Sequence, residues 1–404
     1  MKKAPNDIEF IVGIPSYMEA DRIAFVVREV DKGITRYFSK LNSVIVNVDN
    51  HSGDNTKEAF LSTGTLTPRH YITTPKGVRG KGNNFLNLFR FAQKYAGTLK
   101  AVVVFDADLR SITPEWVNYL GKPVMDGFDY VLPVYSRHQF DGTITNHICY
   151  PLLYSLLGED IRQPIGGEFA FSPSLMKYWL KQEWDTNVRH YGVDIFMTLH
   201  AILGGFKICE AGLGTKVHKA SAPKLGPMFS QVVTTLFNLI LAKKTCWISS
   251  HVESPKPKPR FGLKNLGLPQ ELKIDIRDLK EQLRGEYMQR RKLLKKHLNE
   301  YSVLSLESMF EQDFYSMDIL MWTQVVFQLL SSFQKGSKKV KRDIIEALKP
   351  LYFCRSVTFD YKTWRYDSKH VEGLLKSQAK AFASQKPYFL GLYLHKTTGR
   401  QARQ

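Results

Sequence analysis

Short apolar runs alternate with polar loops and helix-like segments through the first half of the chain. Three of these runs are rich in β-branched residues and predict strands buried on both faces, at residues 8–14, 43–48 and 102–105. Apolar residues recur at helical spacing in the neighbouring segments 20–30, 57–62 and 83–96, and a short strand is expected at 71–73. A repeated order of strand, loop and helix is typical of a parallel sheet built from βαβ units.

The later part of the chain extends this pattern and then replaces it. Further strands are predicted at 129–134 and 206–210, the second followed by a glycine-rich turn at 211–218, and helices at 145–157, 174–180 and 193–203. After residue 221 helix-like segments dominate, at 228–244, 279–299, 313–332 and 338–348, with a proline-rich linker or exposed arm at 253–260. We therefore expect an α/β domain with a mostly parallel sheet over residues 1–222 and a mainly helical domain over residues 223–404.

The distribution of charge divides the chain at the same place. Residues 1–222 contain 25 Lys and Arg against 22 Asp and Glu, whereas residues 223–404 contain 32 against 16. The positive excess in the second part would attract phosphorylated ligands, anionic lipid headgroups or nucleic acid.

Cysteine spacing and the terminal sequence limit the class of protein. The four cysteines lie far apart and show no Cys-x-x-Cys or Cys/His ligand spacing, which argues against a zinc site and against a disulfide framework. The first ten residues lack the apolar core of a signal peptide, and the apolar stretches at 232–242 and 319–330 are too short and too polar to span a bilayer. We expect a cytoplasmic protein without an integral membrane segment.

Two carboxylates directly follow the apolar run 102–105. Side chains alternate along an extended chain, so Asp106 and Asp108 are expected to project to the same side where that strand ends. Such a pair is costly without a counter-charge, which a hard cation such as Mg²⁺ or Mn²⁺ would supply while bridging to phosphate oxygens. The alternative is a solvated Asp-x-Asp turn, the commoner meaning of this motif taken alone.

Other polar clusters precede this pair in a fixed order, at residues 15–19, 48–56 and 80–82. Together with 106–108 they resemble the nucleotide-binding half of the GT-A glycosyltransferases. The later segments 163–168 and 191–195, with a histidine at 218, resemble the group formed by mannosylglycerate synthase and glucosyl-3-phosphoglycerate synthase. The resemblance extends over about residues 8–220. It implies a Rossmann-like GT-A fold and a retaining, metal-dependent hexosyl transfer.

The resemblance also implies which residues bind the metal ion and the donor. Asp108 and His218 would hold Mg²⁺ or Mn²⁺, with Asp106 acting partly through the donor ribose or a water molecule. The segment 49–50 is Asp-Asn where the family pattern has two aspartates, so the donor stays open between a UDP-hexose and a GDP-hexose. The residues expected to contact the nucleotide sugar are Pro15, Tyr17, Glu19, Asp49, Lys81, Asp106 and Gly167.

Simpler roles exist for several of these residues. His218 lies between two lysines, which suits a basic surface loop. Asp49 and Asp54 can cap a helix instead of binding a base. The segment 80–82, Gly-Lys-Gly, lacks the spacing of a Walker loop and can be an ordinary turn before a helix, although its glycines would let the backbone approach a diphosphate.

The predicted catalytic residues are Asp106, Asp108, Glu168 and Asp194. Glu168 can accept a hydrogen bond from a sugar hydroxyl. Asp194 would position a hydroxyl group, although a carboxylate at a helix N-terminus is also stabilised without any function. No protein nucleophile is evident, which favours attack by the acceptor on the face that the leaving group departs from. An anionic acceptor would meet Arg137, Thr143, Asn146, Arg189 and Tyr191, whose alternative is a structural or solvated role.

Three functions follow from these observations. The leading one is a transferase that moves glucose or mannose to glycerate or 3-phosphoglycerate in compatible-solute synthesis; members of this group often form homodimers. The second is a polyprenyl-phosphate glycosyltransferase, whose basic second half would lie on an anionic membrane. The third, disfavoured, is a nucleic-acid-binding protein that uses its basic helices.

Overall fold

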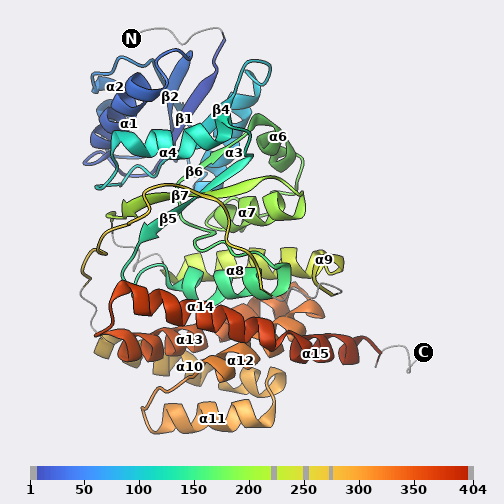
Figure 1. Ribbon diagram of the computed structural model, residues 1–404. Coiled ribbons are helices and arrows are strands. Elements are labelled where there is room, and N and C mark those ends of the chain that lie inside the picture. The colour runs from blue at the N-terminus through green and yellow to red at the C-terminus, as the bar shows by residue number, and fades with distance from the viewer. Residues whose placement is uncertain (1–6, 220–224, 249–253, 273–275, 399–404) are drawn as a thin grey trace. The chain divides into compact units, whose positions relative to one another are not determined.

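The computed structural model describes residues 7–219, 225–248, 254–272 and 276–398 (Figure 1). Two compact units are present, and each is made of three separate stretches of the chain. Unit 1 comprises Met1–Arg137, Arg162–Val232 and Lys258–Gln270. Unit 2 comprises His138–Ile161, Val233–Pro257 and Glu271–Gln404. The expected boundary after residue 222 stays a prediction.

Unit 1 is built on an eight-stranded sheet. All neighbouring strands are parallel except β6, which runs antiparallel to both of its neighbours. In spatial order the strands are β3 (Arg69–Thr73), β2 (Ser43–Asp49), β1 (Phe10–Ser16), β4 (Ala101–Val104), β6 (Phe169–Phe171), β5 (Tyr130–Ser136), β7 (Ile208–Thr215) and β8 (Arg260–Gly262). The predicted class, α/β with a mostly parallel sheet, is confirmed.

Helices cover both faces of this sheet. Because side chains alternate along a strand, Phe10, Val12 and Ile14 of β1 pack into one apolar cluster with α1 (Ile23–Tyr37) and α4 (Pro114–Met125). On the other face α3 (Lys81–Gln93) lies so close to β1 that a Cβ at Gly13 would be 2.3 Å from a Leu88 methyl carbon. The remaining helices of this unit are α2 (Thr56–Ser62), α6 (Pro173–Leu180), α7 (Val193–Leu203) and the beginning of α8 (Leu225–Ala242).

Aromatic rings fill the space between α3, α6 and β6. The Phe89 ring of α3 stacks on Trp179 of α6 at a centroid distance of 5.6 Å, and Phe171 of β6 meets the same indole edge-on at 5.1 Å. These contacts fix α3 against the sheet. This matters for the candidate site because Lys81 is the first residue of α3.

Parallel strands bring their carboxyl ends to one edge, where the polar clusters lie. Backbone hydrogen bonds join the strand ends: Asn50 N donates to Ser16 O at 3.0 Å, and Thr74 N donates to Asp49 O at 2.9 Å. Ligands of open α/β sheets bind beyond this edge.

Two local expectations for unit 1 are corrected by the structure, and two elements were not predicted. The stretch 211–215, expected as a turn, belongs to β7; its glycine at 212 marks a close approach, because a Cβ there would lie 2.1 Å from Leu263 O. The end of the expected linker or arm enters β8, at Arg260. Finally, α4 and β6 were not expected, since α4 contains Pro123 and β6 has only three residues.

Unit 2 is mainly helical, as predicted. The expected helix 145–157 is present as η1 (Thr145–Cys149), α5 (Tyr150–Leu152) and η2 (Leu153–Leu157), with π-helical turns at both ends. The end of α8 and a short α9 (Thr245–Ile248) follow. The others are α10 (Ile276–His297), α11 (Glu300–Glu311), α12 (Ile319–Gln334), α13 (Lys338–Thr363), α14 (Ser368–Ser384) and α15 (Lys386–Thr398).

Polar side chains set where several of these helices begin. The side chains of Asn299, Asp318, Ser337 and Asp367 each accept a hydrogen bond from the backbone N–H three residues further on. This is the usual role of an N-cap residue, which satisfies one of the free donors of the first turn. Apolar rings then close the core, where Phe327 of α12 stacks on Phe389 of α15 at 5.0 Å.

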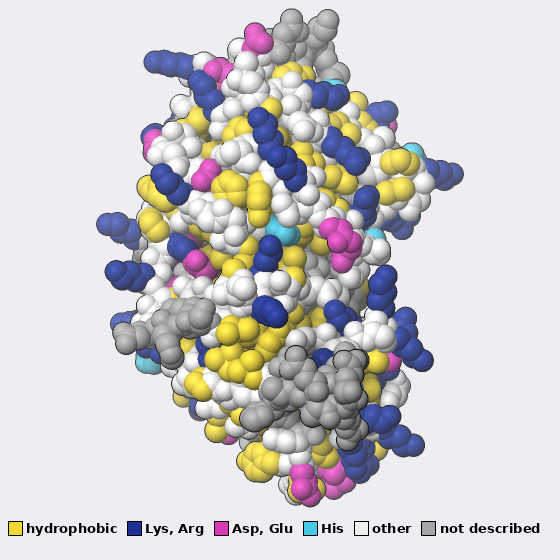
Figure 2. All heavy atoms as spheres, turned by 90° about the vertical axis from the view of Figure 1, so that its right-hand side faces the viewer, with side chains coloured by type: hydrophobic (Ala, Val, Ile, Leu, Met, Phe, Trp, Pro, Cys, Tyr) yellow, Lys and Arg dark blue, Asp and Glu magenta, His cyan; other side chains and the backbone are white. Residues whose placement is uncertain are grey.

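The surface reflects the positive net charge. Figure 2 shows more Lys and Arg side chains than Asp and Glu on the face that it draws.

Helix α8 begins at Leu225, earlier than the apolar stretch in the sequence suggested. By length and composition, Leu225–Ala242 is long and apolar enough to cross a membrane, and 39% of it is buried. The expectation that this stretch is too short to span a bilayer is therefore wrong, although core helices of non-membrane proteins meet the same criterion.

Candidate active site

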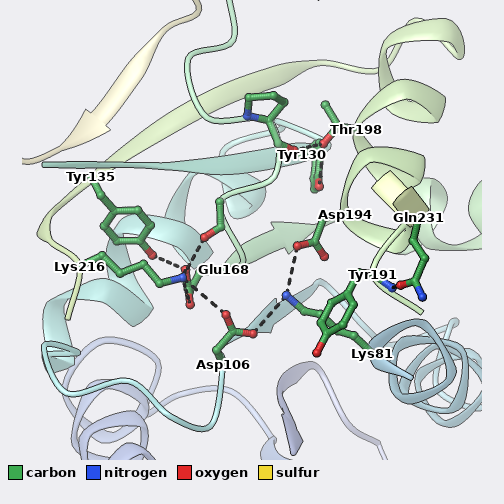
Figure 3. Close-up of polar contacts among 12 residues, drawn as sticks. Lys81, Asp106, Tyr130, Tyr135, Glu168, Tyr191, Asp194, Thr198, Lys216 and Gln231 are labelled. Atoms are coloured by element: carbon green, nitrogen blue, oxygen red, sulfur yellow. Dashed lines mark hydrogen bonds and ion pairs between the residues drawn. The ribbon is translucent and has the colours of Figure 1, made fainter. Parts of the chain in front are cut away.

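One ammonium group joins two carboxylates at the carboxyl edge of the sheet. Lys81 is the first residue of α3, and its Nζ lies 3.2 Å from Asp106 Oδ1 and 3.1 Å from Asp194 Oδ2. Asp106 follows the end of β4, and Asp194 lies in the first turn of α7. Figure 3 shows the Lys81 side chain reaching between the two carboxylates. The fold thus brings together three predicted site residues from three separate elements.

A second buried ammonium group, which the sequence did not single out, lies beside the first. Lys216 follows β7, and its Nζ lies 2.8 Å from Glu168 Oε2 and 2.9 Å from Gly166 O. The same nitrogen lies 3.5 Å from Asp106 Oδ2, so that Asp106 faces an ammonium group on two sides (Figure 3). Tyr135, from β5, donates its hydroxyl to Glu168 Oε2 at 2.6 Å. Glu168 itself is completely buried.

These ion pairs determine the protonation of the carboxylates. Burial alone would raise the pKa of Asp106, but the positive charges of Lys81 and Lys216 outweigh burial and hold that pKa well below its ordinary value. Burial raises the pKa of Glu168 and of Asp194, although the neighbouring ammonium groups oppose the rise. The site therefore combines one carboxylate that stays ionised with two that accept a proton more readily.

One oxygen of Asp194 is available to a ligand. Its Oδ1 atom is buried and has no hydrogen-bond partner among the residues that the structure describes, whereas Oδ2 is held by Lys81. Buried polar atoms are nearly always paired in folded proteins, and each exception calls for an explanation. A hydroxyl group of a bound molecule would satisfy this oxygen.

A glycine makes the close packing of the site feasible. Gly167 has a φ of +104°, a conformation that strains other residues. A Cβ atom there would lie 2.6 Å from Asp106 Oδ2 and 2.8 Å from Lys216 Nζ. Gly167 was predicted to shape a sugar pocket. In the structure a glycine is needed there because a side chain would collide with Asp106 and Lys216.

The two predicted metal ligands lie on adjacent segments. Arg110 N donates to Val217 O at 2.8 Å, and Val217 N donates to Ser111 Oγ at 2.9 Å, which holds the segment after Asp108 against the segment before His218. Both ligand side chains are partly exposed.

The few metal ligands around Asp108 suit a divalent cation that is also coordinated by phosphate oxygens. Within the described ranges no three His, Cys, Asp or Glu side chains gather into a complete metal cage. Mg²⁺ is commonly bound by one or two protein ligands, with phosphate oxygens and water supplying the rest. Burial raises the pKa of Glu19, and the negative charge of Asp108 raises it further. Lys219 partly offsets it, at 2.6 Å from Glu19 Oε2.

Asp49 is buried, and its carboxylate is already occupied. Its Oδ1 accepts hydrogen bonds from Ser16 Oγ at 2.9 Å and Ser52 Oγ at 2.6 Å. Its Oδ2 accepts from Ser52 N at 2.7 Å and from Tyr71 OH at 2.9 Å. These four bonds use the capacity of a carboxylate, so Asp49 braces the loop after β2. The predicted contact with a nucleotide base stays a prediction. Asp54 Oδ1 accepts from Thr56 N at 3.1 Å, although the N-cap position of α2 is held by Asn55, whose side chain makes no capping hydrogen bond.

The first strand-edge loop, which follows Pro15 at the end of β1, contacts the loop before α3. The Arg79 guanidinium lies over the Tyr17 ring at 4.8 Å. Met18 has a φ of 60° and His51 a φ of 54°, values that are uncommon for residues other than glycine. Met18 N donates to Ser52 Oγ at 2.8 Å, which links the loops after β1 and β2. Strained backbone of this kind clusters at ligand sites.

Of the predicted acceptor residues, three lie in unit 1. Arg137 Nη2 donates to Gly166 O at 3.1 Å, which places the guanidinium group beside the residues around Glu168. Tyr191 N donates to Gln231 Oε1 at 3.0 Å. Arg189 Nε donates to Trp184 O at 3.0 Å. Arg137 is thus held beside Gly166, and the backbone of Arg189 contacts the first turn of α3, where Asn83 N donates to Arg189 O at 3.0 Å.

Thr143 and Asn146 belong to unit 2, where both are buried. The Thr143 hydroxyl is hydrogen-bonded to the Tyr352 hydroxyl, and Asn146 O accepts from Gln378 Nε2 at 2.8 Å. Their role in acceptor binding stays a prediction.

Sequence comparison identifies the class of the first part of the chain. Residues 11–178 match the model of Glycosyl transferase family 2. This segment therefore carries a glycosyltransferase domain, and the resemblance to GT-A glycosyltransferases is confirmed for these residues. The match covers 168 of the 404 residues. No curated protein is detectably similar in sequence.

Solved structures that this chain matches include several complexes of glucosyl-3-phosphoglycerate synthase from Mycobacterium tuberculosis. The complex with Mn²⁺, UDP and phosphoglyceric acid is 25% identical, covers 58% of this chain and 78% of its own, and has a TM-score of 0.47. The complex with Mg²⁺ and UDP is 24% identical, covers 58% and 79%, and has a TM-score of 0.46. The complex with Mn²⁺, UDP-glucose and glycerol 3-phosphate is 23% identical, covers 58% and 80%, and also has a TM-score of 0.46.

Proposed function

We propose that this protein is a metal-dependent, retaining glycosyltransferase that moves a hexose from a UDP- or GDP-sugar to a small anionic hydroxy acid. The observation that carries the proposal is the Asp194 carboxylate, with one oxygen held by Lys81 and the other buried and unpaired among the described residues. A sugar hydroxyl is the complementary group, since a hydroxyl donates the hydrogen bond that this oxygen needs. The family match of residues 11–178 supports the reaction class.

The proposed roles follow from the charges. Lys81, between Asp106 and Asp194, holds both carboxylates in place, and its charge would offset that of a donor diphosphate. Lys216 and Tyr135 hold the buried carboxylate of Glu168, which supports the site from within, and Asp194 would accept from a hydroxyl group of the hexose. Asp108 and His218 would hold Mg²⁺ or Mn²⁺. When bound, the metal ion would neutralise the charge that develops on the leaving nucleoside diphosphate.

The acceptor would attack from the side that the diphosphate leaves. The carboxylates of the site are paired with lysines or committed to hydroxyl groups, which supports a mechanism without a protein nucleophile. An oxygen of the departing diphosphate would take the proton of the acceptor hydroxyl. Arg137, beside Gly166, presents a guanidinium group that suits a carboxylate or phosphate of the acceptor. Glycerate and 3-phosphoglycerate are the proposed acceptors, on the resemblance of segments 163–168 and 191–195, with a compatible solute or its phosphate as product.

Release of nucleoside diphosphate tests this proposal. The purified full-length protein is incubated with UDP-glucose, UDP-mannose, GDP-glucose or GDP-mannose, each with glycerate or 3-phosphoglycerate, in the presence of Mn²⁺ or of excess chelator. We expect acceptor-dependent release with metal only, and loss of release in Asp108→Ala with retained folding. Full activity in chelator, or a wild-type rate for Asp108→Ala, would contradict the assignment.

A membrane-bound acceptor, such as a polyprenyl phosphate, is the second candidate. Helix α8 favours it, because Leu225–Ala242 is apolar and long enough to cross a bilayer. Flotation with vesicles that contain anionic lipid separates the two candidates. Binding to these vesicles and transfer to a polyprenyl phosphate would favour the second, whereas a protein that stays unbound and glycosylates glycerate would favour the first. A cytoplasmic location and a homodimer belong to the first proposal.

A further inference from the structure

A basic cavity lies in unit 1 between α3, α6 and the segment that follows α6. Its volume is about 540 Å³, and four of its nine lining residues are Lys or Arg, while none is Asp or Glu. Helix α6 lies at the right of Figure 1, and Figure 2, which draws that side, shows Lys and Arg side chains standing out from unit 1. The lining residues are Leu86, Arg90, Gln93, Lys177, Leu180, Lys181, Gln182, Trp184 and Arg189.

Apart from Arg189, which was also predicted to meet the acceptor, this cavity shares no lining residue with the candidate active site. Leu86, Arg90 and Gln93 are spaced by four and three residues, so they lie on one face of α3. Arg90 follows Lys81 by nine residues, a separation of about 13 Å along the axis of an α-helix. The cavity therefore opens along the middle and end of α3, whereas the ion pairs of the active site lie at its beginning.

The positions of Trp184 and Arg189 are fixed by hydrogen bonds. Trp184 Nε1 donates to Trp179 O at 3.0 Å, and Arg189 Nε donates to Trp184 O at 3.0 Å. Asp185 belongs to the same segment, but its Oδ1 accepts from Val188 N at 2.9 Å, and it does not line the cavity. The four basic residues are exposed and line this open cavity without a lining carboxylate, an arrangement of like charges that favours an anionic ligand.

We propose that this cavity binds a small phosphorylated molecule, held by Arg90, Lys177, Lys181 and Arg189. Arginine offers paired N–H groups to phosphate oxygens, and lysine supplies compact positive charge. The amide groups of Gln93 and Gln182 can donate further hydrogen bonds. The volume lies in the range of small-molecule sites and is too small for a folded partner. The ligand can be a phosphate ester or free inorganic phosphate.

Binding here would act on the beginning of α3. Gly82 N donates to His190 O at 3.1 Å, and Asn83 N donates to Arg189 O at 3.0 Å, so the segment that carries Arg189 is joined to the first turn of the helix that carries Lys81. A ligand that holds Arg189 would therefore stabilise this first turn. The inference does not depend on the proposed transfer reaction.

Calorimetric titration of the full-length protein tests the site. Glucose 6-phosphate and inorganic phosphate are titrated separately in chelator, without nucleotide sugar. We expect saturable binding of at least one probe, weakened roughly tenfold or more in Lys177→Ala/Lys181→Ala, since two of the four charges are removed. Lys40→Ala/Lys207→Ala removes the same charge from exposed positions outside the cavity and is expected to bind as the wild type does.

Each outcome of this titration decides the proposal. Binding of the sugar phosphate alone identifies a phosphate ester as the ligand, and equal binding of both probes identifies free phosphate as sufficient. Absence of saturable binding in the wild type, or wild-type affinity in Lys177→Ala/Lys181→Ala, would overturn the site. These results leave the transferase proposal untouched, because neither metal ion nor donor is present.

Discussion

Lys81 and Asp194 are separated by 113 positions in the chain, and their side chains meet at 3.1 Å. The contact joins the first residue of α3 to the first turn of α7, and it places a positive charge between Asp194 and Asp106. The Lys81 side chain is largely buried there, and the two carboxylates raise its pKa despite its burial. The charge of Lys81 is therefore a fixed part of the site.

Replacing Lys81 tests this arrangement. Lys81→Met leaves two carboxylates of the site without their shared counter-charge, and breaking a buried pair in this way typically costs about 3–5 kcal/mol. We expect kcat/KM to fall at least about 100-fold and the thermal midpoint to drop. Lys81→Arg, which keeps the charge, is expected to retain more of both. Lys76→Met, at an exposed position, serves as the control. Equal kcat/KM in Lys81→Met and wild type would contradict the role.

Glycine at position 167 is expected to be essential for activity. In Gly167→Ala the new methyl group would clash with Asp106 Oδ2 and Lys216 Nζ, in a backbone conformation that alanine disfavours. We expect at least about a 100-fold loss of kcat and a lower thermal midpoint. Gly97→Ala is the matched control, because a Cβ at Gly97 meets nothing within 4 Å. Activity of Gly167→Ala close to that of Gly97→Ala would refute the packing argument.

Metal affinity should depend on both predicted ligands. In His218→Asn one donor is weakened while Asp108 remains, so we expect the Mn²⁺ concentration for half-maximal activity to rise about tenfold or more. Asp108→Asn is expected to show no measurable rate at any Mn²⁺ concentration, since the negative ligand is lost. His70→Asn, in β3, is the control for removing an imidazole. An unchanged Mn²⁺ dependence in His218→Asn would remove His218 from the metal site.

Protonation of Asp194 should affect the pH dependence of kcat/KM. Burial raises its pKa above the ordinary value of about 3.9 for an aspartate. As the pH falls through the raised pKa, protonation removes the negative oxygen that holds Lys81, so kcat/KM should decline at a higher pH than an ordinary carboxylate would cause. In Asp194→Asn the residual activity should lack this decline, whereas Asp126→Asn, at an exposed site, should keep it. The same acidic limb in Asp194→Asn would assign the titration to another group.

Unit 2 offers a separate prediction about stability. Burial raises the pKa of Asp360 to about 8, opposed by the nearby positive charge of Arg355. In the unfolded chain this carboxyl ionises near pH 3.9. Between these two values the folded state holds one proton more than the unfolded state, so the free energy of unfolding decreases as the pH rises.

Urea denaturation at pH 5 and pH 8 measures this effect. The wild type is expected to lose stability between the two pH values, and Asp360→Asn should reduce that loss by as much as a few kcal/mol, because asparagine does not ionise. Asp343→Asn, at a partly exposed position in the same helix, should behave as the wild type. A pH dependence that is identical in Asp360→Asn and wild type would show that Asp360 keeps an ordinary pKa.

Local sequence patterns were sufficient for the elements that are long or rich in β-branched residues. The helix Val193–Leu203 and the core of β2 were predicted at their observed places, since their apolar spacing is regular. Strand β6 was missed because it has three residues and inserts antiparallel between β4 and β5, which depends on tertiary pairing. The glycine at 212 suggested a turn, whereas its function is to let the chain near Leu263 approach β7.

The same limit applies to the candidate site. The carboxylates Asp106, Glu168 and Asp194 could be chosen from motif order, and the fold brings them together. Lys216 could not, because a lysine between Thr215 and Val217 resembles any basic surface loop, and its burial beside Glu168 arises only when β7 is laid next to β5. Thr143 was chosen as an acceptor residue, but its hydroxyl is hydrogen-bonded to Tyr352, from a helix more than 200 residues away. No local pattern in the sequence connects these two residues.

A diffraction experiment tests the central claim most directly. Crystals of the full-length protein, grown with UDP and Mn²⁺, are measured at an X-ray energy that reveals manganese by anomalous scattering. The account predicts the ion in contact with Asp108 and His218, bridging to the diphosphate, with Lys81 beside the phosphate oxygens. Manganese and diphosphate bound away from the end of β4, with Asp106 and Asp108 facing solvent, would contradict it.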